Sequence, residues 1–431
     1  MSHAPELTEP IGHGPIDRRF VGVLAIVLVV IGLVGIGFRA ERFLRGGLSA
    51  DDFTHDFVSA RALRAGGNPY AELQTLLPFT HTHIVYYTLN HHQRNPHSPS
   101  QIVLALPFTA MPYREARVAW LLVSSALLAV AMYWVVRGLG AGVRVALICA
   151  AASLALPIVQ NDLVYGQSGG VMLALLVPTW LRSRKRDSLR AGIPLGIAAG
   201  IKLFPAFLLI PLVRMKRWRA IAAALISGAI VNGLALAMVG WGPARFWLKS
   251  AGPENFRFWR AAPVNISLPG SAFRWLSTSF WRISNLDVPS LALVIAILLM
   301  VIAALIAYLT PARWSGDPYL AALPLMLLAG PLTGDQSLPL MLPFVCAGTI
   351  AIARSVRSRS RYVGWLILVV LVIGTLPGVP SAVPGLSVAV IVLGFGLPTL
   401  ALLGAVALDL VTFSGRQRLP GGSASLSPTP G

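Results

Sequence analysis

The stretch AGIPLGIAAGIKLFPAFLLIPLV, residues 191–213, lies between two basic segments, RSRKRDSLR (182–190) and RMKRWR (214–219). It is long enough for one membrane span, but one span would place the basic segments on opposite faces of the membrane. Because short basic connections face the cytoplasm, we predict two shorter helices that form a hairpin near Lys202-Leu203-Phe204-Pro205, with Pro205 as the helix breaker. A single kinked span is the alternative.

The rest of the chain has the same character. Of its 431 residues, 55% are hydrophobic and 12% are charged, and the mean hydropathy is +0.71. Soluble domains contain about 25% charged residues. Apolar runs recur from Phe20 to Phe413, so we predict an all-α polytopic membrane protein with about 11–12 transmembrane helices, each of roughly 20 residues or fewer.

Charge predicts the orientation of these helices. The net charge is +19, and short connections such as 137–144, 182–190, 214–219 and 354–361 are basic. The connections 164–168, 332–337 and 377–385 contain no Lys or Arg. The basic set should face the cytoplasm and the other set the outside. This interpretation accounts for the charge without nucleic acid as a partner.

The same topology divides the chain into parts. Residues 1–19 form a cytoplasmic tail, 20–413 a single transmembrane domain, and 414–431 a disordered tail rich in Gly, Ser and Pro. Two long loops, 38–115 and 241–288, fall outside. The second is rich in Trp, Phe and Arg, which suits helices lying in the membrane interface or, equally, an aromatic belt.

Cofactor and metal sites are not expected. Cys149 and Cys346 lie inside apolar spans, so a disulfide or Cys-based metal site is implausible. No Gly-rich phosphate loop or dinucleotide fingerprint occurs. The histidines are interpreted as part of a solvated loop rather than a metal site; they are His81, His83, His91, His92 and His97.

Polar residues gather at the predicted outer face. They are Asp51–Asp56, Tyr165–Ser168, Lys202, Gly334–Gln336 and Asn265–Ser267. A channel would distribute polar residues along its spans, whereas polar groups that converge at one face mark a site. This pattern favours chemistry at the membrane surface over permeation.

These residues belong to motifs that resemble those of glycosyltransferase family 87, a group within the GT-C superfamily. The motifs are DFVSARALRAGGNPY (56–70), PHSPS (96–100), GQSG (166–169), GIAAGIKLFPAFLLIPLVRMKRWRA (196–220), NISL (265–268) and GPLTGDQ (330–336). They occur in the family's order over about residues 50 to 350. Where the family usually has Trp-Asp-His, this chain has Gly334-Asp335-Gln336-Ser337.

The resemblance implies a GT-C-like helical bundle and a polyprenyl-phosphate sugar as the donor. It places Arg61 and Lys202 at the donor phosphate. It also suggests substrate contacts from the remaining motif residues: Asp52, Tyr70, Gln167, Asn265, Asp335 and Gln336.

Sugar transfer from a lipid phosphate to a hydroxyl needs a general base and a group that stabilises the departing phosphate. Asp56, in the first motif, is the predicted base, and the alternative is a helix N-cap. Lys202 could instead extend its ammonium to the interface without binding phosphate.

The predicted function is an inverting hexosyltransferase, in the first place a mannosyltransferase, that acts on a glycolipid or glycan at the extracytoplasmic face of a bacterial-type plasma membrane. Three alternatives remain. They are a polyprenyl-phosphate-pentose (arabinose) transferase, a non-catalytic carrier of lipid-linked glycans, and an inactive assembly subunit.

Overall fold

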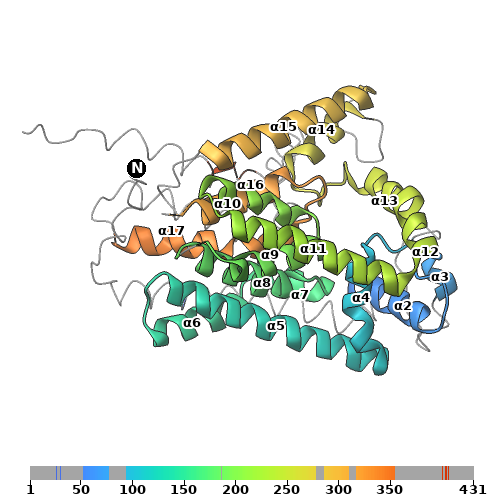
Figure 1. Cartoon of the computed structure of the whole chain (residues 1–431), viewed down its shortest axis with the longest axis horizontal. Helices are drawn as coiled ribbons and strands as arrows, with labels where there is room; N and C mark the ends of the chain where they lie inside the picture. Colours follow the sequence, from blue (N-terminus) through green and yellow to red (C-terminus); the bar gives the residue numbers. More distant parts are fainter. Residues whose placement is uncertain are drawn as a thin grey trace, which may run out of the picture.

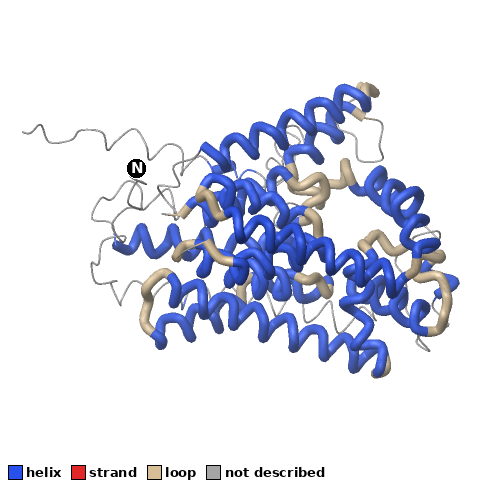
Figure 2. The backbone as a smooth tube through the Cα atoms, in the orientation of Figure 1, coloured by secondary structure: helices blue, strands red, loops and turns tan. Residues whose placement is uncertain are grey.

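The computed structural model describes residues 52–76, 94–185, 187–277, 286–309 and 317–354, together with a few single positions. Every regular element in these ranges is a helix (Figures 1 and 2). Among the described residues, three helices are long and apolar enough to cross a membrane, or four if a bent pair counts as one span. The prediction of an all-α polytopic membrane protein is confirmed. The predicted span at 20–37, the connection 377–385 and both tails lie outside the described residues.

The elements follow one another in a simple order. The first group is α2 (Asp52–Arg64), α3 (Leu73–Leu76), α4 (Pro99–Ala105) and the 3-10 helix η2 (Leu106–Ala110). The bundle then begins with α5 (Tyr113–Gly138), α6 (Val143–Leu154), α7 (Pro157–Tyr165), α8 (Gly169–Ser183) and α9 (Leu189–Ile201). It continues with η3 (Phe204–Leu208), α10 (Leu209–Arg214) and α11 (Trp218–Val239).

The remaining helices complete the bundle and its second outer segment. Helices α12 (Trp241–Phe246), η4 (Trp247–Ala251), α13 (Gly252–Trp259) and α14 (Leu268–Leu276) follow α11. The chain returns through α15 (Pro289–Leu309), α16 (Pro318–Ala329), η5 (Asp335–Met341) and α17 (Leu342–Arg354). Figure 1 shows α2, α3, α12 and α13 together at one end of the molecule, opposite the turn between α5 and α6.

The predicted hairpin at 191–213 is confirmed. Helix α9 ends at Ile201, and Lys202 is extended, with φ −128° and ψ 133°. Helices α9 and α11 run parallel, because Gly192 contacts Ala220 and Gly196 contacts Ala224. The segment between them must therefore reverse direction, and η3 and α10 carry it back.

The basic connections meet at one end of the bundle. The Arg184 guanidinium donates to the carbonyl of Gly138 at 3.0 Å and forms an ion pair with Asp317 at 3.2 Å. Asp187 accepts hydrogen bonds from the backbone N–H groups of Arg219 and Ala220. These contacts join the connections after α5, α8 and α10, which the charge pattern had assigned to one face.

The two described connections without Lys or Arg, 164–168 and 332–337, lie together at the other end, which we call the site end. Trp120, on the first part of α5, donates to the carbonyl of Gly166 at 2.9 Å. Lys202, at the tip of the hairpin, contacts Gln167, and η5 packs against α7. The site end thus contains 164–168, Lys202 and 332–337, as the charge pattern predicted.

Helix α15 presents small residues inward and large ones outward. Its buried side chains are Ala292, Ala296, Ala303 and Ala307, whereas Leu293, Val294, Ile297, Leu298 and Leu305 are exposed. Lipid chains are as apolar as Leu, so helices in membranes associate through close packing of small residues. This arrangement is typical of a helix with one face toward lipid.

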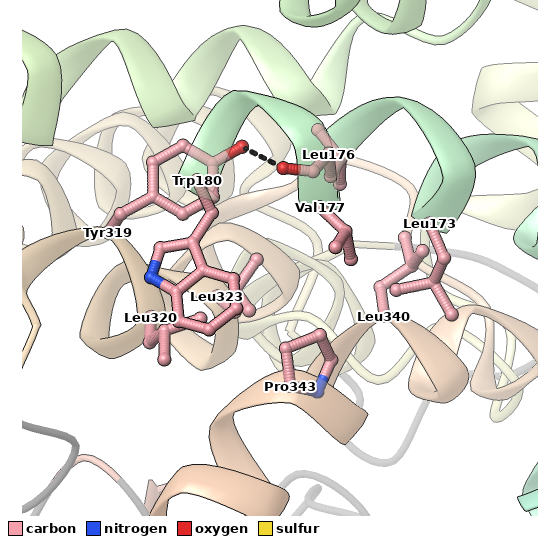
Figure 3. A pocket seen from close by; sticks show the side chains of 9 residues that line it. All are labelled: Leu173, Leu176, Val177, Trp180, Tyr319, Leu320, Leu323, Leu340 and Pro343. Carbon is pink, nitrogen blue, oxygen red and sulfur yellow. Dashed lines mark hydrogen bonds between the residues drawn. The ribbon is translucent and has the colours of Figure 1, made fainter. Parts of the chain in front are cut away.

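The core between α8 and α16 is apolar and well packed. Figure 3 shows a small cavity there, with Leu173, Trp180, Tyr319 and Leu340 among its lining residues. The Tyr319 hydroxyl donates to the carbonyl of Leu176 at 3.3 Å, and the Trp180 indole donates to Asp317 at 3.0 Å. The cavity wall contains no charged side chain, so this region serves packing rather than chemistry.

Glycine allows the close approach of α9 and α11, and a matched pair of substitutions tests this. A Cβ at Gly196 would overlap the carbonyl oxygen of Ala224, whereas a Cβ at Gly233 would meet nothing within 4 Å. We expect Gly196→Ala to lower the free energy of unfolding by about 1–3 kcal/mol. Gly233→Ala should raise it by about 0.5–1 kcal/mol, because alanine favours the helix. Thermal unfolding in detergent measures both, and equal effects of the two changes would contradict this packing.

Candidate active site

Asp56 lies in the second turn of α2 and is 6% exposed. Helix α2 is held in place by apolar neighbours, because Phe53 and Phe57 pack against Tyr113 and Trp120. This packing leaves Asp56 facing the loop that precedes α4. The helix begins four residues earlier, at Asp52. The N-cap interpretation of Asp56 is therefore wrong.

Three side chains hold the Asp56 carboxylate. Asn95 Nδ2 donates to Oδ1 at 3.1 Å, His97 Nδ1 lies 2.8 Å from Oδ1, and Gln101 Nε2 donates to Oδ2 at 3.1 Å. A carboxylate has about four lone-pair positions. Oδ1 is bonded twice and Oδ2 once, so Oδ2 retains a position for a further donor. A substrate hydroxyl could donate there.

His97 forms an ion pair with Asp56 when its ring is protonated. Burial lowers the pKa of His97, but the charge of Asp56 and their hydrogen bond raise it by more, so the net pKa lies above the ordinary value. A nearby Asp52 adds to this effect and Lys202 opposes it. The interpretation of His97 as part of a solvated loop is wrong; the other four histidines lie outside the described residues.

The raised pKa of His97 predicts how stability depends on pH. A group whose pKa is raised on folding contributes its stabilisation in full below its unfolded pKa, about 6.5, and loses it as the pH rises through the folded value. We expect the melting temperature of the parent to exceed that of His97→Gln by the widest margin below about pH 6.5, and this margin to narrow as the pH rises above that value. A margin that is constant with pH would contradict the ion pair. Thermal melting at several pH values measures this.

Tyr70 supports the same loop. Its side chain is fully buried, and its hydroxyl donates to the carbonyl of His97 at 3.1 Å. The Asn95 side chain also accepts from the backbone N–H of His97 at 2.8 Å. Tyr70, a predicted substrate contact, therefore holds the backbone of the loop that contains His97.

Lys202 lies at the break between α9 and η3. Its Nζ donates to Gln167 Oε1 at 2.6 Å, and Gln167 is 4% exposed. The ammonium also interacts electrostatically with the carboxylates of Asp52, Asp162 and Asp56. Because the ammonium donates to the amide of the buried Gln167, it is oriented into the protein. The structure thus brings Asp52, Asp56, Gln167 and Lys202 together.

The turn between α7 and α8 orients Gln167. Gly166 has a φ of +68°, and Phe53 of α2 packs against it so closely that a side chain would not fit. Asp162 Oδ1 accepts the backbone N–H of Gly169 at 3.2 Å, and the Asp162 carbonyl accepts that of Gln167. This turn joins α2 to the hairpin tip.

Arg61, a predicted contact of the donor phosphate, bonds to backbone outside the group around Asp56. Arg61 donates to the carbonyl of Met111 at 2.7 Å, and its guanidinium lies 5.3 Å from the Phe57 ring centre. Among the described contacts, the Arg61 side chain therefore bonds to Met111 and to none of the residues that hold Asp56. Its role at the donor phosphate stays a prediction.

Asn265 joins two loops at the site end. Its amide donates to the carbonyls of Arg260 and Pro331, and its Oδ1 accepts from Ser267 and from the backbone of Thr333. These bonds occupy both amide hydrogens and the carbonyl oxygen. The observed contacts of Asn265 are therefore structural.

Asp335 and Gln336 begin η5, immediately after the loop held by Asn265. Gln336 is half-buried, and its side chain packs over Gly334. The side chain of Asp335 lies outside the described residues. Both residues stay predicted substrate contacts.

Sequence reasoning missed Asn95, His97 and Gln101 as ligands of Asp56. The spacing of His97 and Gln101 contained no helical signal, because His97 precedes the N-cap Ser98 of α4. Asn95 had no such signal either, since it lies in irregular backbone. Asp162, which holds the turn before α8, was not among the predicted site residues.

The described part of the chain contains no group of three or more His, Cys, Asp or Glu side chains arranged to hold a metal ion. The site end contains a buried, hydrogen-bonded carboxylate, Asp56, and the half-buried ammonium of Lys202. This pair suits proton acceptance and the stabilisation of an anion.

Comparison with known proteins gives one match. No curated protein and no solved structure matches the chain significantly. The sequence profile of glycosyltransferase family 87 matches residues 96–343, more than half of the chain. This range includes His97, Gln167, Lys202 and Asn265, whereas Asp56 precedes it. The chain therefore belongs to glycosyltransferase family 87.

Proposed function

We propose that this glycosyltransferase moves a hexose, mannose in the first place, from a polyprenyl phosphate to a hydroxyl of a glycolipid or glycan. The reaction would take place at the extracytoplasmic face of a bacterial-type plasma membrane and invert the anomeric centre. The observation that supports it most is the buried carboxylate of Asp56, which three side-chain donors hold at the end of the bundle that also contains Lys202.

The proposed reaction is a single displacement. The acceptor oxygen attacks the anomeric carbon, and its proton passes to Asp56 Oδ2, the oxygen with a lone pair to spare. The bond between the anomeric carbon and the phosphate oxygen breaks, and its electron pair goes to the phosphate. Inversion follows because the acceptor enters opposite the leaving group.

Two features of the site favour this chemistry. The donors Asn95, His97 and Gln101 hold the Asp56 carboxylate in one orientation before substrate binds. Gln167 holds the Lys202 ammonium in a similar way, and the ammonium would balance the charge that grows on the phosphate. Groups oriented in advance need not reorganise during the reaction, which is a major source of catalysis.

Turnover by the purified protein in lipid nanodiscs tests the proposal. Polyprenyl-phosphate mannose, glucose and arabinose would be supplied with a lipid extract as the acceptor source, and release of polyprenyl phosphate would be measured. We expect release from the mannosyl donor. If polyprenyl phosphate is released from the arabinosyl donor alone, the protein is a pentosyltransferase instead of a hexosyltransferase. If no donor releases it, the non-catalytic alternatives are favoured.

Cysteine labelling tests the proposed face. In a background without Cys149 and Cys346, we expect Tyr165→Cys at the site end to react with an impermeant thiol reagent in intact cells. Lys185→Cys, at the basic end, should react only after the cells are opened. Both positions are exposed. The reverse pattern would place the site end in the cytoplasm.

A further inference from the structure

The segment that follows α11 covers the loop that holds Asp56. It consists of α12, the π-helix η4 and α13, and it lies beside α2 and α3 (Figure 1). Its outward side chains are Trp241, Arg245, Leu248 and Lys249, which are exposed. Phe246 and Trp247 instead pack inward against Ala60, Tyr70 and Ile102.

Trp247 contacts the loop at its centre. Its indole N–H donates to the carbonyl of Pro96 at 3.2 Å. Pro96 lies between Asn95 and His97, the two residues that bond to Asp56 Oδ1. The hydrogen bond from Trp247 of η4 therefore holds the residue next to both Asn95 and His97, whose side chains bond to the proposed base.

A second contact joins the same elements at the start of the loop. Arg94 donates to Glu254 of α13 at 3.0 Å and to Glu72 at 3.3 Å, and it lies over the ring of Phe246. Glu254 is half exposed, so this ion pair contributes little energy. Among the contacts of the segment with residues 94–98, the hydrogen bond from Trp247 to Pro96 is therefore the one we test.

The π-helical turn orients Trp247. The backbone N–H of Gly252 bonds to the carbonyl of Trp247, five residues earlier. A Cβ at Gly252 would lie 3.0 Å from that carbonyl oxygen and 3.5 Å from the indole ring. Single π-helical turns are rare and often occur at functional sites. Here the turn directs the indole toward Pro96.

The loop needs such support because residues 94–98 lie outside any helix. Its other contacts come from Tyr70, which bonds to the carbonyl of His97, and from Ser98, whose hydroxyl bonds to the carbonyl of Ile201 beside Lys202. Trp247 and Tyr70 fix the carbonyls of Pro96 and His97, and the third contact fixes the side chain of Ser98. Removal of one should therefore shift the loop without unfolding it.

We infer that Trp247 is a positioning residue for sugar transfer, which acts by fixing Pro96 and thereby the orientation of Asn95 and His97 around Asp56. This inference rests on the proposed role of Asp56 as the base. It assigns to the segment after α11 a part in the reaction although none of its side chains bonds directly to Asp56 in the described structure.

Trp247→Phe tests the inference, since phenylalanine retains an aromatic ring and removes the N–H. We expect kcat to fall by about 2- to 10-fold, the net value of one hydrogen bond, while KM for the donor stays within about twofold. Trp241→Phe is the matched control, because Trp241 is exposed on the same segment; it should retain the parental kcat. Equal losses in both variants would overturn the inference.

A double-mutant cycle separates positioning from general stability. If Trp247 acts through the loop, Trp247→Phe should cost less in kcat when His97→Gln is already present. If the fold-loss of kcat in the double variant equals the product of the two single losses, Trp247 acts independently of His97 and the inference is wrong. Gly252→Ala, which perturbs the π-helical turn, should reproduce the kcat loss of Trp247→Phe.

Hydrogen–deuterium exchange tests the contact without any turnover. We expect residues 94–98 to exchange faster in Trp247→Phe than in the parent and in Trp241→Phe. Unchanged exchange would overturn the inference even if the enzyme is active. If Trp247→Phe exchanges faster than the parent but the parent itself transfers no sugar, the structural contact is supported and the proposed function is refuted.

Discussion

Replacing Asp56 with asparagine is expected to lower the turnover number by about 10²- to 10⁴-fold, the usual contribution of a general base. The amide has nearly the shape of the carboxylate and retains one oxygen acceptor, but it cannot take the acceptor proton. Steady-state release of polyprenyl phosphate measures the effect. Donor binding should change little, because the variant fills the same buried space. The melting temperature should fall as it does in His97→Gln, because both changes remove the ion pair between Asp56 and His97.

Asp52→Asn and Asp335→Asn are the matched controls for this prediction. Asp52 begins the same helix and lies close enough to interact with Lys202, while Asp335 begins η5. Both should retain far more activity than Asp56→Asn. If Asp56→Asn transfers sugar at the parental rate while one control is inactive, the base is that other residue.

Replacing Lys202 with methionine is expected to lower kcat by about 10²- to 10³-fold, the loss typical when one group that stabilises developing negative charge is removed. Methionine fills a similar volume but provides neither charge nor N–H to the leaving phosphate. Lys202 is half-buried and bonded to Gln167, so water that enters the variant site should stabilise the phosphate less well than the ammonium does. Inhibition by free polyprenyl phosphate should weaken in parallel.

Lys185→Met is the control, because Lys185 is exposed at the opposite, basic end of the bundle. It should retain the parental rate and the parental inhibition constant. If Lys202→Met behaves like Lys185→Met, the ammonium does not contact the donor. Melting curves of both variants would show whether lost activity reflects unfolding, since removal of Lys202 leaves three nearby carboxylates without their counter-charge.

Much of the architecture was predictable from local patterns. The apolar stretch 191–213 with basic flanks and Pro205 predicted a hairpin, and α9 and α11 do run parallel with the chain reversed between them. The separation of basic connections from those without Lys or Arg predicted the two ends of the bundle. Asp56, Gln167 and Lys202 were identified by their motifs, and the structure brings them to one end.

The partners of these residues were not predictable. His97 was grouped with four other histidines, yet it bonds to Asp56. Arg61 was expected to accompany Asp56, yet five residues along α2 it turns to Met111. Asn265 was expected at the substrate, but its bonds connect its own loop to Pro331 and Thr333.

The sequence by itself determined the helical class, the hairpin and the division into two ends, because a bilayer constrains a chain along one dimension. Each stretch must be apolar enough to enter the membrane, and each connection must satisfy the charge rule, so both properties can be assessed from nearby residues. Only the tertiary structure decided which side chains surround Asp56. Those contacts come from the irregular segment 94–98 and from the start of α4. The path of that segment depends on packing among helices distant in sequence, and no local periodicity records such a path.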